Sequence, residues 1–95
     1  MIEVRDNPSE SRYEAWLDGE LAGIAVYGLG PVSIVFLHTE VLPEFEGKGV
    51  GGALAKGALD DVRARGERDV IPLCPFIKGW IEKHPDYQDL VHTSR

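Results

Sequence analysis

Four glycines fall within six residues of this 95-residue chain, in Gly47-Lys48-Gly49-Val50-Gly51-Gly52. Glycine in the first turn of a helix costs about 1 kcal/mol relative to alanine, so it is tolerated where backbone turns tightly or approaches another group closely. A glycine-rich turn at a helix N-terminus leaves several N–H groups free, and the positive end of the helix dipole lies beside them. The pattern predicts a site for an anion such as a phosphate.

Cys74 is the only cysteine, and it stands directly before Pro75, a residue typical of the first position of a helix. This order predicts that Cys74 is the N-cap of a helix, where the dipole favours a thiolate. The thiol could then act as a nucleophile and carry an acyl group. The alternative is a small buried apolar side chain, the most common environment of a free cysteine.

His38 and Glu40 are two further groups with acid–base chemistry, and both lie in an apolar stretch before the glycine-rich turn. Strand alternation predicts that they share one face with Ile34 and Phe36, while Thr39 faces the other way. A histidine can serve as a general base near neutral pH. The alternatives are a half-buried histidine bonded to backbone and a solvated glutamate at the strand end.

Hydrophobic periodicity predicts the elements that position these groups. Alternating stretches at residues 1–5, 12–17, 20–27 and 32–41 indicate strands. Asp18-Gly19 is a preferred sequence for a type I′ hairpin turn, so the strands should form an antiparallel meander. From residue 50 to 65 the apolar positions recur at helical spacing, and Gly66 suits the end of that helix.

The remaining segments complete a βαβ unit. Residues 70–73 indicate a short strand that should pair in parallel with the strand before the helix. A second helix should start at Pro75, carry Phe76 on its apolar face and end by Pro85. Residues 87–91 are expected to pack back on the sheet, and residues 92–95 to fray. The expected fold class is therefore mixed α/β: a strand meander, then a βαβ unit and a C-terminal helix.

Composition narrows the class of protein. The length predicts one domain over residues 1–95. The formal net charge of -6 disfavours nucleic acid and anionic membranes as partners and is compatible with cationic amines. No apolar run approaches the roughly 20 residues of a membrane span, and the single cysteine suggests a reducing compartment, hence the cytoplasm. We expect no metal centre, and either a monomer or a weak dimer fits the composition.

The glycine-rich stretch differs from two common phosphate-binding turns and fits a third. The dinucleotide fingerprint requires its glycines immediately after a strand, but Pro43-Glu44-Phe45-Glu46 intervenes here. The nucleotide P-loop requires Lys-Ser or Lys-Thr, but Lys48 is followed by glycine. The third pattern fits: Val-Leu-Pro-Glu-Phe-Glu-Gly-Lys-Gly-Val-Gly, at residues 41–51, resembles the acetyl-CoA-binding motif of the GNAT superfamily of N-acetyltransferases.

The resemblance extends beyond the turn. The motif usually reads Arg/Gln-x-x-Gly-x-Gly/Ala, and here Glu46, Gly49 and Gly51 stand at those positions. Glu46 departs from the pattern, and Lys48 can offset its charge. Further similar stretches are His-Thr-Glu-Val at 38–41, residues 59–66, Pro-Leu-Cys-Pro-Phe at 72–76 and residues 82–87. Together they are similar to a subgroup of small, single-domain GNAT proteins.

The resemblance implies an acetyl-CoA-dependent transfer to an amine of a small molecule or of a lysine-bearing peptide. The pyrophosphate would bind backbone amides of the turn, and the pantetheine arm would lie between two splayed strands. The residues expected to contact the cofactor are Thr39, Val41, Glu46, Gly47, Lys48, Gly49, Val50, Gly51 and Gly52. Glu40, His38 and Cys74 are the candidate catalytic residues.

One expected feature of the family is missing. Many GNAT enzymes carry a tyrosine in the second helix as general acid, and the corresponding position here is Ile81. Tyr87 is the nearest replacement and Cys74 is another. The alternative function is therefore a non-catalytic module that binds CoA or acyl-CoA, or a protein partner, on the same fold.

Overall fold

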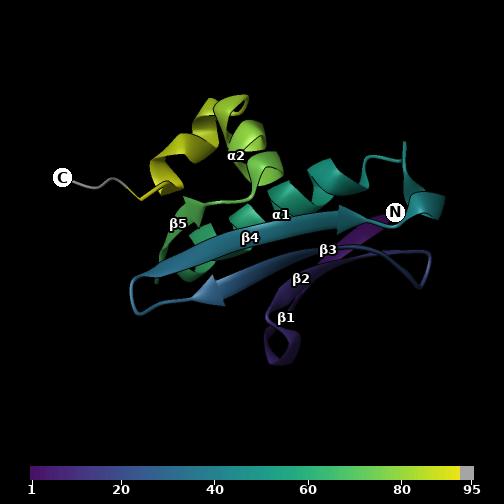
Figure 1. Ribbon diagram of the computed structural model, residues 1–95, viewed down its shortest axis with the longest axis horizontal. Helices are drawn as coiled ribbons and strands as arrows, with labels where there is room; N and C mark the ends of the chain where they lie inside the picture. Colours follow the sequence, from purple (N-terminus) through teal and green to yellow (C-terminus); the bar gives the residue numbers. More distant parts are fainter. Residues whose placement is uncertain (93–95) are drawn as a thin grey trace.

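A computed structural model describes residues 1–92, in which five strands form one sheet with the order β1-β2-β3-β4-β5 (Figure 1). The strands are β1 (Ile2–Asn7), β2 (Arg12–Leu17), β3 (Glu20–Leu29), β4 (Ser33–Val41) and β5 (Asp69–Pro72). The helices are α1 (Val50–Arg65) and α2 (Pro75–Glu82), and short 3-10 turns occupy Pro8–Glu10, Pro43–Phe45 and Pro85–Leu90. The predicted order of elements is confirmed, with strand ends moved by one or two residues.

Pairing follows the expected meander and βαβ unit. β1 to β4 are antiparallel to their neighbours, and β5 pairs in parallel with β4. The hairpin between β2 and β3 has positive φ at both Asp18 (50°) and Gly19 (81°), as a type I′ turn requires. β3 runs two residues further than expected and ends at Leu29, so the turn before β4 is shorter. Figure 1 shows α1 running alongside β4.

The core lies between the inner face of the sheet and the two helices. Buried residues of α1 are Val50, Leu54, Ala55, Ala58, Leu59 and Val62, which have helical spacing. Ile77 and Ile81 of α2 join the same buried cluster. Tyr87, Leu90 and Val91 pack against it as predicted, and Val91 bridges to Val70.

The end of the described chain is bonded to the sheet. His92 donates its backbone N–H to Val70 and contacts Asp69 through its ring, 2.6 Å away. The predicted fraying therefore does not begin at His92, and residues 93–95 lie outside the described part. No helix within residues 1–92 is both long and apolar enough to cross a membrane.

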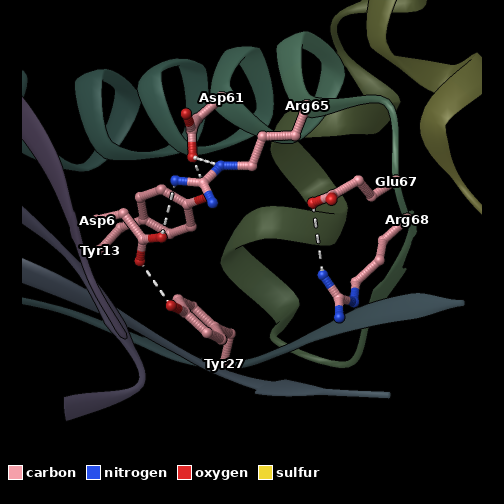
Figure 2. A network of polar contacts seen from close by, with 7 residues as sticks. All are labelled: Asp6, Tyr13, Tyr27, Asp61, Arg65, Glu67 and Arg68. Atoms are coloured by element: carbon pink, nitrogen blue, oxygen red, sulfur yellow. Dashed lines mark hydrogen bonds and ion pairs between the residues drawn. The ribbon is translucent and has the colours of Figure 1, made fainter. Parts of the chain in front are cut away.

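A polar network fixes the C-terminal end of α1 to the meander (Figure 2). The Tyr13 hydroxyl donates to Asp61 at 2.7 Å, and the Tyr27 hydroxyl donates to Asp6 at 2.6 Å. Arg65 donates to both carboxylates, at 2.9 Å to Asp61 and 3.3 Å to Asp6. Burial and these acceptors raise the pKa of both tyrosines, so they remain protonated donors.

Candidate cofactor and acyl-transfer site

The turn before α1 has the geometry of an anion site. Gly47 and Gly49 have φ of 83° and 79°, and a Cβ at either would meet nothing within 4 Å, so conformation is what requires glycine there. No backbone N–H from residue 47 to 52 donates to a backbone carbonyl within residues 1–92. The first turn of α1 has no acidic residue and no side-chain cap. These free donors fit the oxygens of a diphosphate.

Not every predicted cofactor contact fits equally well. The N–H of Glu46 donates to the carbonyl of Pro43 at 3.3 Å and closes the 3-10 turn, so the run of free donors begins at Gly47. The side chains of Glu46 and Lys48 are both exposed at the mouth of the turn. Lys48 is therefore available to offset the carboxylate beside it.

Gly51 is a glycine for a different reason from its neighbours. A Cβ there would lie 2.9 Å from Cζ of Phe76, whereas one at Gly52 would lie 3.8 Å from Nε1 of Trp80, an ordinary contact. The absence of a side chain at Gly51 thus lets the ring of Phe76, from α2, approach the first turn of α1. Sequence reasoning expected Phe76 in the core, and this was wrong: the residue is 45% exposed, although Trp80 does pack against the core.

β4 has a free edge on the side of β5. The two strands pair only from Ser33 to Phe36 on β4, and the N–H of Cys74 then donates to the carbonyl of Phe36 at 2.8 Å. No residue of β5 pairs with the stretch 37–41 of β4. This stretch contains Thr39 and Val41, whose backbone was expected to hold the pantetheine arm. An unpaired strand edge suits the amide groups of such an arm.

A β-bulge in β4 changes which side chains share a face. Val26 pairs with His38 and Tyr27 pairs with Phe36, so Leu37 is an extra residue without a partner on β3. The extra residue reverses the alternation. The prediction that His38 and Glu40 share the face of Phe36 was therefore wrong. They do share a face with each other, with Nε2 and Oε1 3.4 Å apart.

The cysteine lies where its sequence context predicted. Cys74 is the N-cap of α2, and it is only 3% exposed. Its Sγ lies 3.3 Å from Oγ1 of Thr39, on the inner side of β4. The side chain makes no cap hydrogen bond to the helix. The thiol is therefore directed at the strand rather than at its own helix.

The candidate groups thus divide between two faces of one strand. Thr39 and Cys74 lie on the inner side, whereas His38 and Glu40 lie on the outer side with side chains 62% and 56% exposed. Glu40 also lines a shallow outer hollow of about 280 Å³. Because β4 and β5 stop pairing at this level, the two sides meet at the gap between the strands. The arrangement can bring two reactants together from opposite faces.

Ile81 stands at the position of the missing tyrosine, and Tyr87 is its predicted replacement. Ile81 is 3% exposed in the core. The Tyr87 hydroxyl donates to Asp60 of α1 at 2.7 Å, and this hydrogen bond raises the pKa of Tyr87. No hydrogen bond joins Tyr87 to Cys74, His38 or Glu40 within residues 1–92. Tyr87 is therefore tied to α1, and its role as a replacement for the tyrosine stays a prediction.

A larger hollow lies away from these groups. Its volume is about 450 Å³, and it is lined by the aromatic and charged residues around Tyr27 and Arg65, with Glu67 and Arg68 on its other side (Figure 2). This position is at the C-terminal end of α1, and a helix of 16 residues is about 24 Å long. The hollow is therefore too far from the glycine-rich turn to belong to the same site.

Comparisons with known proteins agree with this geometry. A family model described as GCN5-related N-acetyltransferase matches residues 12–90, and the chain belongs to this family of acyltransferases, known as GNAT. The match covers the turn, the free edge of β4 and Cys74. No curated protein matches the chain.

Two solved structures share the fold. A GCN5-like N-acetyltransferase candidate from Staphylococcus aureus has 25% identity and a TM-score of 0.71, covering 98% of this chain and 90% of that one. A ribosomal-protein-alanine N-acetyltransferase from Brucella melitensis has 19% identity and a TM-score of 0.60, covering 88% of this chain and 62% of that one. The second likeness concerns the fold alone, and its chain extends well beyond the part matched here.

Proposed function

We propose that this GNAT protein transfers an acetyl group from acetyl-CoA to an amine. The carrying observation is a run of free N–H groups at residues 47–52 beside a stretch of β4, residues 37–41, that pairs with β3 but not with β5. The first suits a diphosphate and the second suits the amides of a pantetheine arm. Acetyl-CoA has both parts in one molecule and supplies the acetyl group as an activated thioester.

The acceptor amine should approach from the outer face of β4. His38 and Glu40 lie in contact there and are exposed, so either can take the proton that an ammonium group must lose before the amine attacks. The net charge of -6 favours a cationic acceptor through long-range attraction. A small amine and a lysine-bearing peptide both meet these requirements.

Two routes for the acetyl group fit the site. In direct transfer, the neutral amine attacks the acetyl carbonyl and one of its protons passes to Glu40 or His38. The carbon–sulfur bond to CoA breaks, CoA leaves as the thiolate, and the protonated base returns the proton to the CoA sulfur directly or through water. In the second route, Sγ of Cys74 bonds to the acetyl carbon as the carbon–sulfur bond to CoA breaks, and CoA leaves with the thiol proton. The amine then attacks acetyl-Cys74, the new carbon–sulfur bond breaks, and Cys74 regains a proton from the amine.

The 3.3 Å contact between Thr39 and Cys74 supports the second route, because a hydroxyl can donate to a thiolate. The low exposure of Cys74 supports a structural thiol and hence direct transfer. Mass spectrometry of the protein after incubation with acetyl-CoA separates the two. An acetyl adduct on wild type that is absent from Cys74→Ala indicates the second route. Full turnover by Cys74→Ala indicates direct transfer.

The proposal as a whole is tested by release of CoA thiol in the presence of a panel of primary amines and lysine peptides. Amine-dependent release supports it. Binding of acetyl-CoA without release by any amine would favour the non-catalytic module, which the apolar Ile81 also supports. No binding at millimolar acetyl-CoA would refute both the transfer and a CoA-binding module, and would leave only a module that binds a protein partner.

A further inference from the structure

Phe76 is an exposed aromatic residue whose ring lies against Gly51. It lies in the first turn of α2, whose Ile77 and Ile81 are buried in the core. The ring meets α1 with its far edge: Cζ, Cε2 and Cε1 lie 2.9, 3.4 and 3.5 Å from where a Cβ on Gly51 would be. This edge-on contact leaves the residue 45% exposed. A ligand could therefore lie against the ring without displacing it.

Phe76 is also close to both parts of the proposed donor site: in space to the glycine-rich turn, and in sequence to Cys74. Gly51 belongs to the run of free N–H groups. Cys74, two residues before Phe76, donates its N–H to Phe36, the last residue of β4 that pairs with β5. Leu73 beside it is 64% exposed. Two exposed apolar side chains, Leu73 and Phe76, therefore flank Cys74 in the chain.

We infer that Phe76 positions the donor: its ring contacts the arm that joins the diphosphate to the thioester, and it makes the site prefer CoA over nucleotides without the arm. The inference rests on the proposed function. Its physical basis is that the methylene groups of the arm would be removed from water against the ring. The diphosphate itself would be bound by the turn and not by Phe76.

The first test compares two ligands on wild type and Phe76→Ala by isothermal titration. One ligand is CoA, and the other is 3′-phosphoadenosine 5′-diphosphate, which has the diphosphate and lacks the arm. Phe76→Ala should weaken CoA binding about tenfold, on the basis of the apolar area that the ring can cover, and leave binding of the second ligand unchanged.

A second variant displaces the ring of Phe76 through a substitution in α1. Gly51→Ala keeps the backbone N–H but places a Cβ where the far end of the Phe76 ring now lies, so the half-exposed ring must swing away. It should weaken CoA binding in the wild-type background and have no further effect in Phe76→Ala. Gly79→Ala is the control, because Gly79 lies in α2 outside the donor site and a Cβ there would meet nothing within 4 Å.

The possible results distinguish a failure of the role of Phe76 from a failure of the proposed function. Equal CoA affinity of wild type and Phe76→Ala, or an equal loss for both ligands, would overturn the role of Phe76 while leaving CoA binding in place. Additive effects of Gly51→Ala and Phe76→Ala would also overturn it. If wild type binds neither ligand, the proposed function fails and the inference fails with it.

Discussion

Substitution of Gly49 by alanine tests the conformation of the anion turn. Gly49 has φ of 79° and open space around it, so an added methyl group would meet no atom within 4 Å and only the backbone would be strained. The left-handed conformation costs an ordinary residue about 1–2 kcal/mol. For a domain of this size, each kcal/mol lowers Tm by about 4–8 °C. Gly49→Ala should therefore lose at least about 4 °C.

Gly66 is the matched control at the other end of the same helix. It is the C-cap of α1, with φ of 64° and again nothing within 4 Å of a Cβ. Gly66→Ala should lose a similar amount of stability through the same strain. Its position is remote from the turn, so any difference in ligand binding between the two variants reports on the turn itself.

Urea denaturation gives the stability of both variants, and titration with acetyl-CoA gives their affinity. Relief of strain at Gly49 would tilt the neighbouring N–H groups, and loss of one hydrogen bond to a charged group costs about 1.5–3 kcal/mol. Gly49→Ala should therefore bind acetyl-CoA about 10- to 100-fold more weakly, while Gly66→Ala should bind like wild type. Wild-type affinity of Gly49→Ala would refute the prediction that this substitution displaces the N–H groups that bind the diphosphate.

Three further predictions concern other parts of the structure. Hydrogen bonds, chiefly from Asn7, lower the pKa of the nearly buried Glu14 below its usual 4.5, so its stabilisation is present above that pH and is lost as pH falls through the lower folded pKa. By urea denaturation, Glu14→Gln should cost about 1–3 kcal/mol at neutral pH and less at about pH 3, and an equal cost at both would contradict this. Gly57→Ala should lower Tm although alanine favours helices, because its Cβ would lie 2.7 Å from Cβ of Val4. An unchanged or higher Tm would contradict this and would show that β1 can move away from α1. If Cys74 carries the acetyl group, Thr39→Val should slow its acetylation about tenfold by mass spectrometry and Thr39→Ser should not, since only the hydroxyl contacts Sγ; equal rates would leave Thr39 without a role.

The parts of the fold that sequence predicted correctly depend on local signals. Asp18 and Gly19 form the expected turn because both adopt the positive φ that their types favour. Gly47 and Gly49 do the same in the anion turn. Cys74 precedes Pro75 at a helix start because proline suits the first helical position. Each of these follows from a few neighbouring residues.

The parts that sequence missed depend on contacts between distant segments. The extra residue Leu37 becomes visible only once β3 is aligned with β4, and it reverses the faces on which His38 and Phe36 lie. The approach of Phe76 to Gly51 depends on how α2 packs beside α1. Alternation and helical spacing describe one segment at a time, so neither feature could be read from them.

The most direct test of the central claim is an NMR titration of the ¹⁵N-labelled protein with acetyl-CoA. If the turn binds the diphosphate, acetyl-CoA should cause saturable shifts that are largest for the amides of residues 47–52, with smaller shifts along residues 37–41 of β4. Unchanged amides in the turn at millimolar acetyl-CoA would contradict it. So would shifts confined to the distant hollow beside Tyr27 and Arg65.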